Sequence, residues 1–174
     1  MALRVVKGAV LPAVSLEEAK EHLDVDDAYR NDYIVALIAA ATDVVEYHTQ
    51  RRLVTQTLEW VTAGFCARLV LPVAPVQSVT SVKYRDESGV EQTLAPADYV
   101  VRTDKATAVI VPAEGGSFPI AAAVAAEPVV VRFVAGYGES ESIPPVARHL
   151  IKLLIKDFYD PHRGTLVTGT TVGT

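Results

Sequence analysis

A glycine-rich turn, Gly136-Tyr137-Gly138, precedes an acidic, serine-rich stretch and a proline pair near the end of the chain. Such a turn before a helix can hold a phosphate, because backbone amides and the positive end of the helix dipole point at the anion. Here the third glycine of a dinucleotide fingerprint and the Gly-Lys-Ser/Thr ending of a nucleotide-triphosphate loop are both missing. Glu139 and Glu141 would repel a phosphate. The turn is therefore predicted to be structural, with Gly136 and Gly138 as a hinge between a strand and the last helix.

The other reactive side chains form no catalytic or metal-binding pattern. None of the four histidines has the spacing of a metal pair, and "GYGES" is not the Gly-x-Ser-x-Gly of a nucleophile elbow. Cys66 is expected to be a packed thiol, not a nucleophile. We predict no catalytic residue, no metal and no cofactor. The histidines are His22, His48, His149 and His162.

One alternative from a different class stays open. It is a small hydrolase or nucleotide-binding enzyme that uses the turn from Gly136 to Ser142.

Composition narrows the choice of partners. The chain has 174 residues, of which 50% are hydrophobic, so a single domain with a real core is expected. It carries 16 basic and 21 acidic residues, a formal net charge of −5. A general nucleic-acid binder needs a basic surface to displace counterions, and an anionic membrane also attracts basic segments. Both classes are therefore disfavoured, and an interaction role is the natural default.

The N-terminal part, residues 1–53, is predicted to be helical. Ser15 and Glu18 have the spacing of a capping box at the start of a short helix, "SLEEAKEHL". The following "DYIVALIAAATDVVEYHTQRRL" has apolar residues at helical spacing and is the strongest helix signal in the chain.

The pattern after residue 53 changes to the two-residue period of strands. Residues 54–135 are predicted to form an inserted antiparallel β unit, with Gly89 in a hairpin turn. Residues 136–160 return to a helix, "SIPPVARHLIKLLIKDFYD", which has proline in its first turn. Residues 161–174, rich in threonine and glycine, are predicted to be an extended tail. The apolar stripe of the last helix consists of Val146, Leu150, Leu153, Leu154 and Phe158.

The predicted fold class is therefore α+β. It is a small helical bundle, made of two N-terminal helices and a C-terminal helix, with an inserted antiparallel β unit and an extended C-terminal tail.

The chain from about Val14 to Tyr159 resembles the head–tail connector (adaptor) proteins of long-tailed bacteriophages, prophages and gene transfer agents. The similar segments are "SLEEAKEHLDVDD", "DYIVALIAAATDVVEYHTQRRLVTQTLEW", "LVLPVAPVQSVTSVKYRDESGVEQTLAPADYVV" and "VRFVAGYGESESIPPVARHLIKLLIKDFYD". They resemble the family in order and spacing, although no single motif is diagnostic. An infectious phage and a gene transfer agent are equally compatible with these residues.

The resemblance implies a structural virion protein of the neck, made in the bacterial cytoplasm. Members of this family form a dodecameric ring under the portal protein and join it to tail-side proteins, such as a stopper or a tail terminator. Double-stranded DNA passes through the ring without specific binding, and an acidic wall would repel its phosphates. The family has no catalytic residue or cofactor. A soluble protein-binding module outside a virion is a further alternative.

Two kinds of contact residue follow from the resemblance. A closed ring needs two different adhesive faces on each copy, and small or apolar segments suit them. The predicted ring-interface residues are Ala39, Ala40, Phe118, Ile120 and Val124. The C-terminal segment is the portal-docking element of the family, and a threonine- and valine-rich tail can add a strand to a sheet edge. The predicted portal-binding residues are His162, Arg163, Thr165, Leu166, Val167, Thr168, Thr170, Thr171 and Val172.

Overall fold

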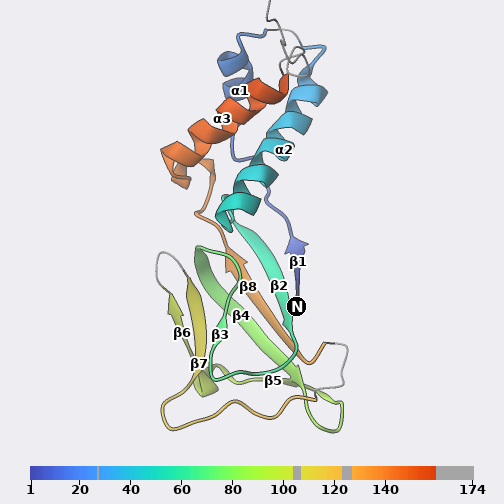
Figure 1. Ribbon diagram of the computed structural model, residues 1–174, viewed down its shortest axis with the longest axis vertical. Helices are drawn as coiled ribbons and strands as arrows, with labels where there is room; N and C mark the ends of the chain where they lie inside the picture. Colours follow the sequence, from blue (N-terminus) through green and yellow to red (C-terminus); the bar gives the residue numbers. More distant parts are fainter. Residues whose placement is uncertain (27, 104–106, 123–126, 160–174) are drawn as a thin grey trace, which may run out of the picture.

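The computed structural model describes residues 1–26, 28–103, 107–122 and 127–159, which form an elongated molecule with helices at one end and strands at the other (Figure 1). The fold class is α+β, as predicted. Each end has its own group of buried apolar side chains. In the described part of the chain, no helix is long and apolar enough to span a bilayer.

The helical part contains α1 (Leu16–Leu23), α2 (Asn31–Thr49) and α3 (Pro145–Tyr159). The predicted capping box is present at α1, where Ser15 Oγ accepts from the Glu18 amide at 3.1 Å and Glu18 Oε2 accepts from the Ser15 amide at 3.1 Å. Helix α2 buries Ile34, Ile38, Ala41 and Val45, which recur at helical spacing and face the core.

The β part consists of two antiparallel sheets. The larger has the order β1-β2-β8-β4-β5 and the smaller has the order β3-β7-β6. Their inner faces enclose Leu58, Trp60, Ile110, Val131 and Phe133. The bounds are β1 Ala2–Lys7, β2 Gln56–Thr62, β3 Leu69–Val70, β4 Val76–Arg85, β5 Glu91–Thr93, β6 Tyr99–Thr103, β7 Ala108–Pro112 and β8 Val129–Ala135; short 3-10 turns η1 and η2 cover Pro96–Asp98 and Ser140–Ser142.

The first strand lies within residues 1–53, the part of the chain for which the sequence predicts only helices. Ala2–Lys7 form β1, an edge strand that pairs antiparallel with β2 and extends the larger sheet (Figure 1). Most of its side chains are exposed, so its sequence lacks the alternation that marks a half-buried strand. Leu3, opposite Trp60, is the β1 side chain that packs against the β core.

The two parts meet at a junction where three chain segments are joined by backbone hydrogen bonds. The Arg52 amide donates to Ala74 O at 2.9 Å and the Gly136 amide donates to Pro75 O at 2.9 Å. The Thr55 amide donates to Gly138 O at 3.0 Å. The end of α2, the start of β4 and the end of β8 are therefore held against one another.

Gly136 is the tightest point of this junction. Its φ is +130°, and a Cβ added there would lie 2.5 Å from Val54 O and 2.6 Å from the Thr55 nitrogen. Both neighbours are backbone atoms, which cannot rotate away as the end of a side chain can. Glycine is therefore required by contact and by conformation.

Replacing Gly136 with alanine is expected to lower the free energy of unfolding by about 3 kcal/mol, because the methyl group clashes and the backbone is strained. Urea unfolding followed by circular dichroism measures this loss. Gly64→Ala is the matched control, since nothing lies within 4 Å of its added Cβ. An equal effect of the two substitutions would contradict the role given to Gly136.

Candidate assembly surfaces

The backbone amides and carbonyl groups of the turn at Gly136 form hydrogen bonds within the protein. The Tyr137 amide donates to Leu53 O at 3.1 Å, and Gln77 Nε2 donates to Gly136 O at 2.9 Å. Arg51 Nη1 donates to the Tyr137 hydroxyl at 2.8 Å. The Gly136 and Tyr137 amides are therefore not directed at a ligand, and no observation favours the enzyme alternative. The hinge role of Gly136 and Gly138 stays a prediction.

The reactive side chains are dispersed. Within the described ranges, no three His, Cys, Asp or Glu residues are placed to hold a metal ion. His48 and His149 are exposed, whereas His22 is half-buried between α1 and α3. Burial lowers the pKa of His22 below its usual value, and the nearby charges of Lys152, Lys156 and His149 lower it further. Cys66 is exposed, so the expected packed thiol is wrong: it lies in an open loop after β2.

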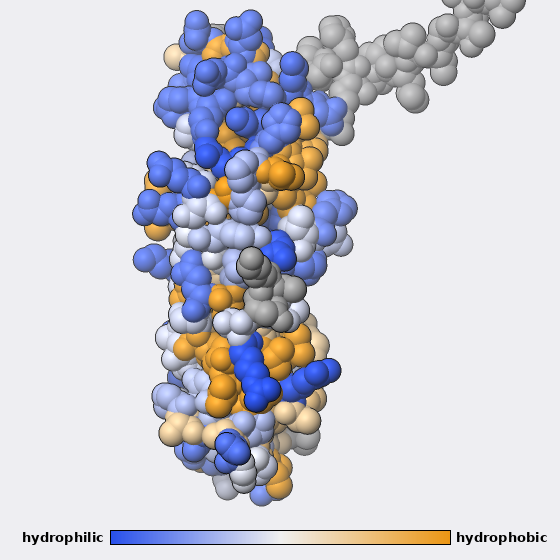
Figure 2. All heavy atoms as spheres, turned by 90° about the vertical axis from the view of Figure 1, so that its left-hand side faces the viewer, coloured by the Kyte–Doolittle hydropathy of each residue, from blue (hydrophilic) through white to orange (hydrophobic). Residues whose placement is uncertain are grey.

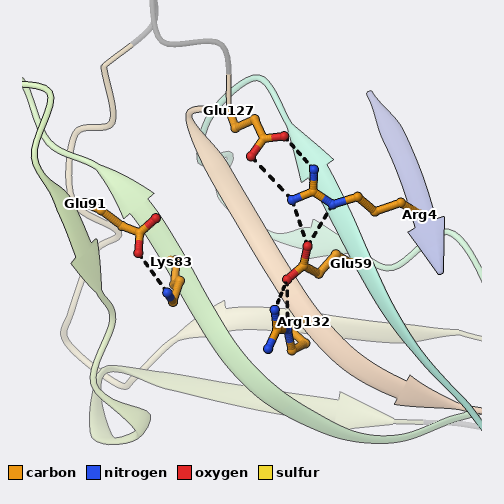
Figure 3. Close-up of polar contacts among 6 residues, drawn as sticks. All are labelled: Arg4, Glu59, Lys83, Glu91, Glu127 and Arg132. Carbon is orange, nitrogen blue, oxygen red and sulfur yellow. Dashed lines mark hydrogen bonds and ion pairs between the residues drawn. The ribbon is translucent and has the colours of Figure 1, made fainter. Parts of the chain in front are cut away.

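An ion-pair ladder crosses the outer face of the larger sheet (Figure 3). The register places Arg4, Glu59 and Arg132 side by side on β1, β2 and β8. Glu59 accepts from Arg4 Nε at 2.8 Å and from Arg132 Nη2 at 2.5 Å, and Arg4 also pairs with Glu127 at 2.7 Å. The ladder ties the edge strand β1 to the centre of the sheet.

The two arginines of the ladder favour the charged form of Glu59. Burial opposes the charged form of this side chain, but the hydrogen bonds and positive charges of Arg132 and Arg4 outweigh it. The pKa of Glu59 therefore lies below its ordinary value.

The structure separates the predicted ring-interface residues. Ala39 and Ala40 are exposed on α2, whereas Phe118 and Ile120 lie in the loop after β7, in the β part. Phe118 is half-buried because it stacks on Phe65 at 4.8 Å between ring centroids, so part of its apolar surface is already covered within the chain. Ile120 is 71% exposed. Val124 lies outside the described residues.

The predicted portal-binding residues all lie outside the described residues as well. They are His162, Arg163, Thr165, Leu166, Val167, Thr168, Thr170, Thr171 and Val172.

The predicted apolar stripe of the last helix is wrong in part. Ile151 and Ile155 are the fully buried residues of α3, whereas Val146, Leu150 and Leu153 are exposed. Helix α3 is therefore apolar on two faces: one packs on α2 and the other is open. The sequence alone does not distinguish these two faces, because α3 carries more apolar residues than its contact with α2 can cover. Leu154 and Phe158 are half-buried against the helical core.

A second exposed apolar face lies on the smaller sheet. Val70 and Val100 are exposed on it, and Val109 and Val111 are half-buried beside them. The strand register brings Val70 next to Val109 and Val100 next to Val111. Figure 2 shows apolar side chains gathered over this part of the molecule, and a further apolar area over the helical part. Exposed patches of this kind mark surfaces that contact other proteins.

The fold is similar to that of chains from gene transfer agent particles. One chain, from the neck of an empty particle computed with C6 symmetry, has a TM-score of 0.78 and 24% identity over 98% of this chain and 90% of that one. Another, from the virion of a native particle, has a TM-score of 0.75 and 24% identity over 95% of this chain and 88% of that one.

A third chain is from the neck of a native particle computed with C12 symmetry. It has a TM-score of 0.70 and 28% identity over 95% of this chain and 87% of that one. No protein-family model matches the sequence, and no curated protein sequence matches it. The structural similarities span nearly the whole chain, and they support a structural neck protein.

Glu59→Gln is expected to lower the free energy of unfolding at pH 7 by about 2 kcal/mol, because two arginines lose a charged acceptor. The lowered pKa of Glu59 means that its contribution is present above about pH 5 and is lost as the pH falls through that pKa. The difference in the free energy of unfolding between the wild type and the variant should therefore become smaller as the pH falls. Urea unfolding followed by the fluorescence of Trp60 measures it.

The matched control is Glu91→Gln, which removes an exposed ion pair with Lys83 on the same sheet (Figure 3). Its effect should be well under that of Glu59→Gln, because exposed pairs contribute little. If the difference in the free energy of unfolding between the wild type and Glu59→Gln stayed constant from pH 7 to pH 3.5, Glu59 would not be stabilised as an anion.

Proposed function

We propose that this chain is a structural head–tail connector (adaptor) in the neck of a tailed phage or gene transfer agent. Copies form a ring under the portal protein and join it to a tail-side protein, a stopper or a tail terminator. The role is mechanical, with no catalysis and no cofactor. The observation that carries the proposal is the whole-length similarity of fold to gene transfer agent neck chains.

The exposed surfaces agree with an assembly subunit. The open face of α3, the valine-rich face of the smaller sheet and Ile120 would each be covered by neighbours in a ring. A ring of one kind of chain uses a head-to-tail contact in which two different faces meet. The C12 symmetry used for one similar neck supports twelve copies. The predicted contact residues Ala39, Ala40, Phe118, Ile120 and Val124 stay part of this proposal.

The charge of the chain suits a passage for DNA. Each copy carries a net charge of −5, so a ring of twelve would be acidic as a whole, and a channel wall of the same sign is part of the proposal. Such a wall repels phosphates and lets a duplex slide, which is the requirement for a channel without specific binding. Cryo-electron microscopy of particles that contain this chain tests the proposal as a whole. Density for the fold in a ring between head and tail would support it, and its absence from the neck would overturn it.

The portal contact is assigned to the tail, residues 161–174. Deleting Thr165–Thr174 is expected to leave the stability unchanged, because both described cores lie before residue 160. It should weaken binding to the purified portal at least about tenfold, since a strand added to a sheet edge contributes main-chain hydrogen bonds and side-chain contacts. Thermal unfolding and surface plasmon resonance are the two measurements.

A Gly/Ser tail of the same length is the control for chain length alone. It should bind as weakly as the deletion. Unchanged portal affinity of the deletion variant would remove the tail from the portal contact without affecting the proposed place in the neck.

A further inference from the structure

Helix α1 is a short element with little buried apolar surface. It has eight residues, and Ala19 is the one among them that is fully buried. A helix of this length is not stable alone, so α1 depends on its contacts with α2 and α3 (Figure 1). The polar contacts between α1 and α3 therefore contribute to keeping α1 in place.

Two rows of polar side chains meet between α1 and α3. On α1, Glu18 and His22 are four residues apart, so they lie on one side of the helix. On α3, Arg148, Lys152 and Lys156 follow one another at intervals of four residues and form the second row. Arg148 donates to Glu18, and this is the ion pair that joins the two helices in the described part of the chain.

The surroundings of His22 oppose a positive charge on its ring. Its Nε2 atom is buried and has no hydrogen-bond partner among the described residues. No described carboxylate forms an ion pair with His22, and Glu18, one turn away on α1, is already paired with Arg148. The charged groups that act on His22 lie on α3, and α2, the other helix in contact with α1, supplies none. They are Lys152, Lys156 and His149.

Burial and these three basic groups lower the pKa of His22 below its ordinary value. The ring is therefore neutral at pH 7 while α1 is in place. Protonation would put a charge on a buried ring that has no acceptor for its Nε2 proton and faces cations.

We propose that α1 is an acid-released element: protonation of His22 detaches α1 from α3, while the other helices and the two sheets stay folded. In the detached state the imidazolium reaches water and moves away from the cations of α3. The detached state therefore binds the proton more tightly than the attached state does, and acidification favours detachment. The proposal is independent of the ring proposed above.

The sign of the shift sets the pH range of the release. A histidine with a lowered pKa stabilises the attached state above about pH 6.5, the ordinary pKa of the side chain. This contribution is lost as the pH falls from there towards the lowered pKa of His22. Release should therefore increase on the acidic side of neutrality.

The ion pair of Glu18 responds to pH in a lower range. Burial opposes the charged form of Glu18, but the Ser15 amide and Arg148 outweigh it, so the pKa of Glu18 lies below its usual value. The pair with Arg148 is therefore kept down to about pH 5. A change in α1 between pH 7 and pH 5 then belongs to His22.

Hydrogen exchange of the full chain, followed by mass spectrometry, measures the release. The protection of the amides of residues 16–23, corrected for the intrinsic exchange rate at each pH, should fall at least about threefold between pH 7 and pH 5. Low concentrations of urea should change the exchange of α1 much less than that of β8, because a local opening exposes little surface.

Three variants assign the effect. His22→Gln does not titrate in this range and should abolish the loss of protection. Lys152→Gln removes the largest charge contribution at His22 and should reduce the loss; it decides the question if circular dichroism shows that His22→Gln is unfolded. The matched control is His48→Gln, at an exposed position near the end of α2, which should behave as the wild type does.

A loss of α1 protection in the wild type that His22→Gln abolishes supports the proposal. Equal protection of wild-type α1 at pH 7 and pH 5 overturns it. An undiminished loss in folded His22→Gln also overturns it, because another group then controls the release. If the exchange of α1 depends on urea as steeply as that of β8, α1 opens only when the whole chain unfolds, and the proposal fails.

Discussion

The junction between the two cores is the constraint on which the rest of the structure depends. Glu46, at the end of α2, is 4% exposed, and its carboxylate accepts from the Leu53 amide at 2.7 Å and from Arg52 Nη1 at 2.6 Å. This interaction turns the chain from α2 towards β2. Because Gly136 packs directly against Val54 and Thr55, the return from β8 to α3 is set by the same few residues. The direction of the helices relative to the sheets is therefore decided locally.

Polar interactions and open apolar surface are distributed differently over the molecule. The larger sheet pairs its buried carboxylate, Glu59, with two arginines. The helices and the smaller sheet leave apolar side chains exposed. A monomer that remained alone would gain nothing from such exposure, whereas a subunit covers it by association. The open face of α3 and the valine-rich face of the smaller sheet are among the surfaces proposed to meet other chains.

Much of the fold could be predicted because its signals are local. The capping box of Ser15 and Glu18, the spacing of Ile34, Ile38 and Ala41, and the Gly89 turn each depend on residues close in sequence. Strand β1 could not be predicted, since an edge strand with exposed side chains is stabilised by distant pairing with β2. The orientation of α3 was mistaken because an apolar residue has the same sequence signal whether it faces its own core or another chain. Cys66 was misplaced because loop exposure is decided by tertiary packing.

The N-terminal strand has a consequence for the mechanics of the molecule. Because β1 belongs to the sheet and α1 to the helical part, the chain passes between the two parts three times: in residues 8–15, 50–55 and 136–144. A body connected at one point can swivel, and one connected at two points can still rock about the line between them. Three connections limit the relative motion of the two parts more than a single link would. The junction at Gly136, where two of the three connections are joined by backbone hydrogen bonds, is the place from which load on one end would pass to the other.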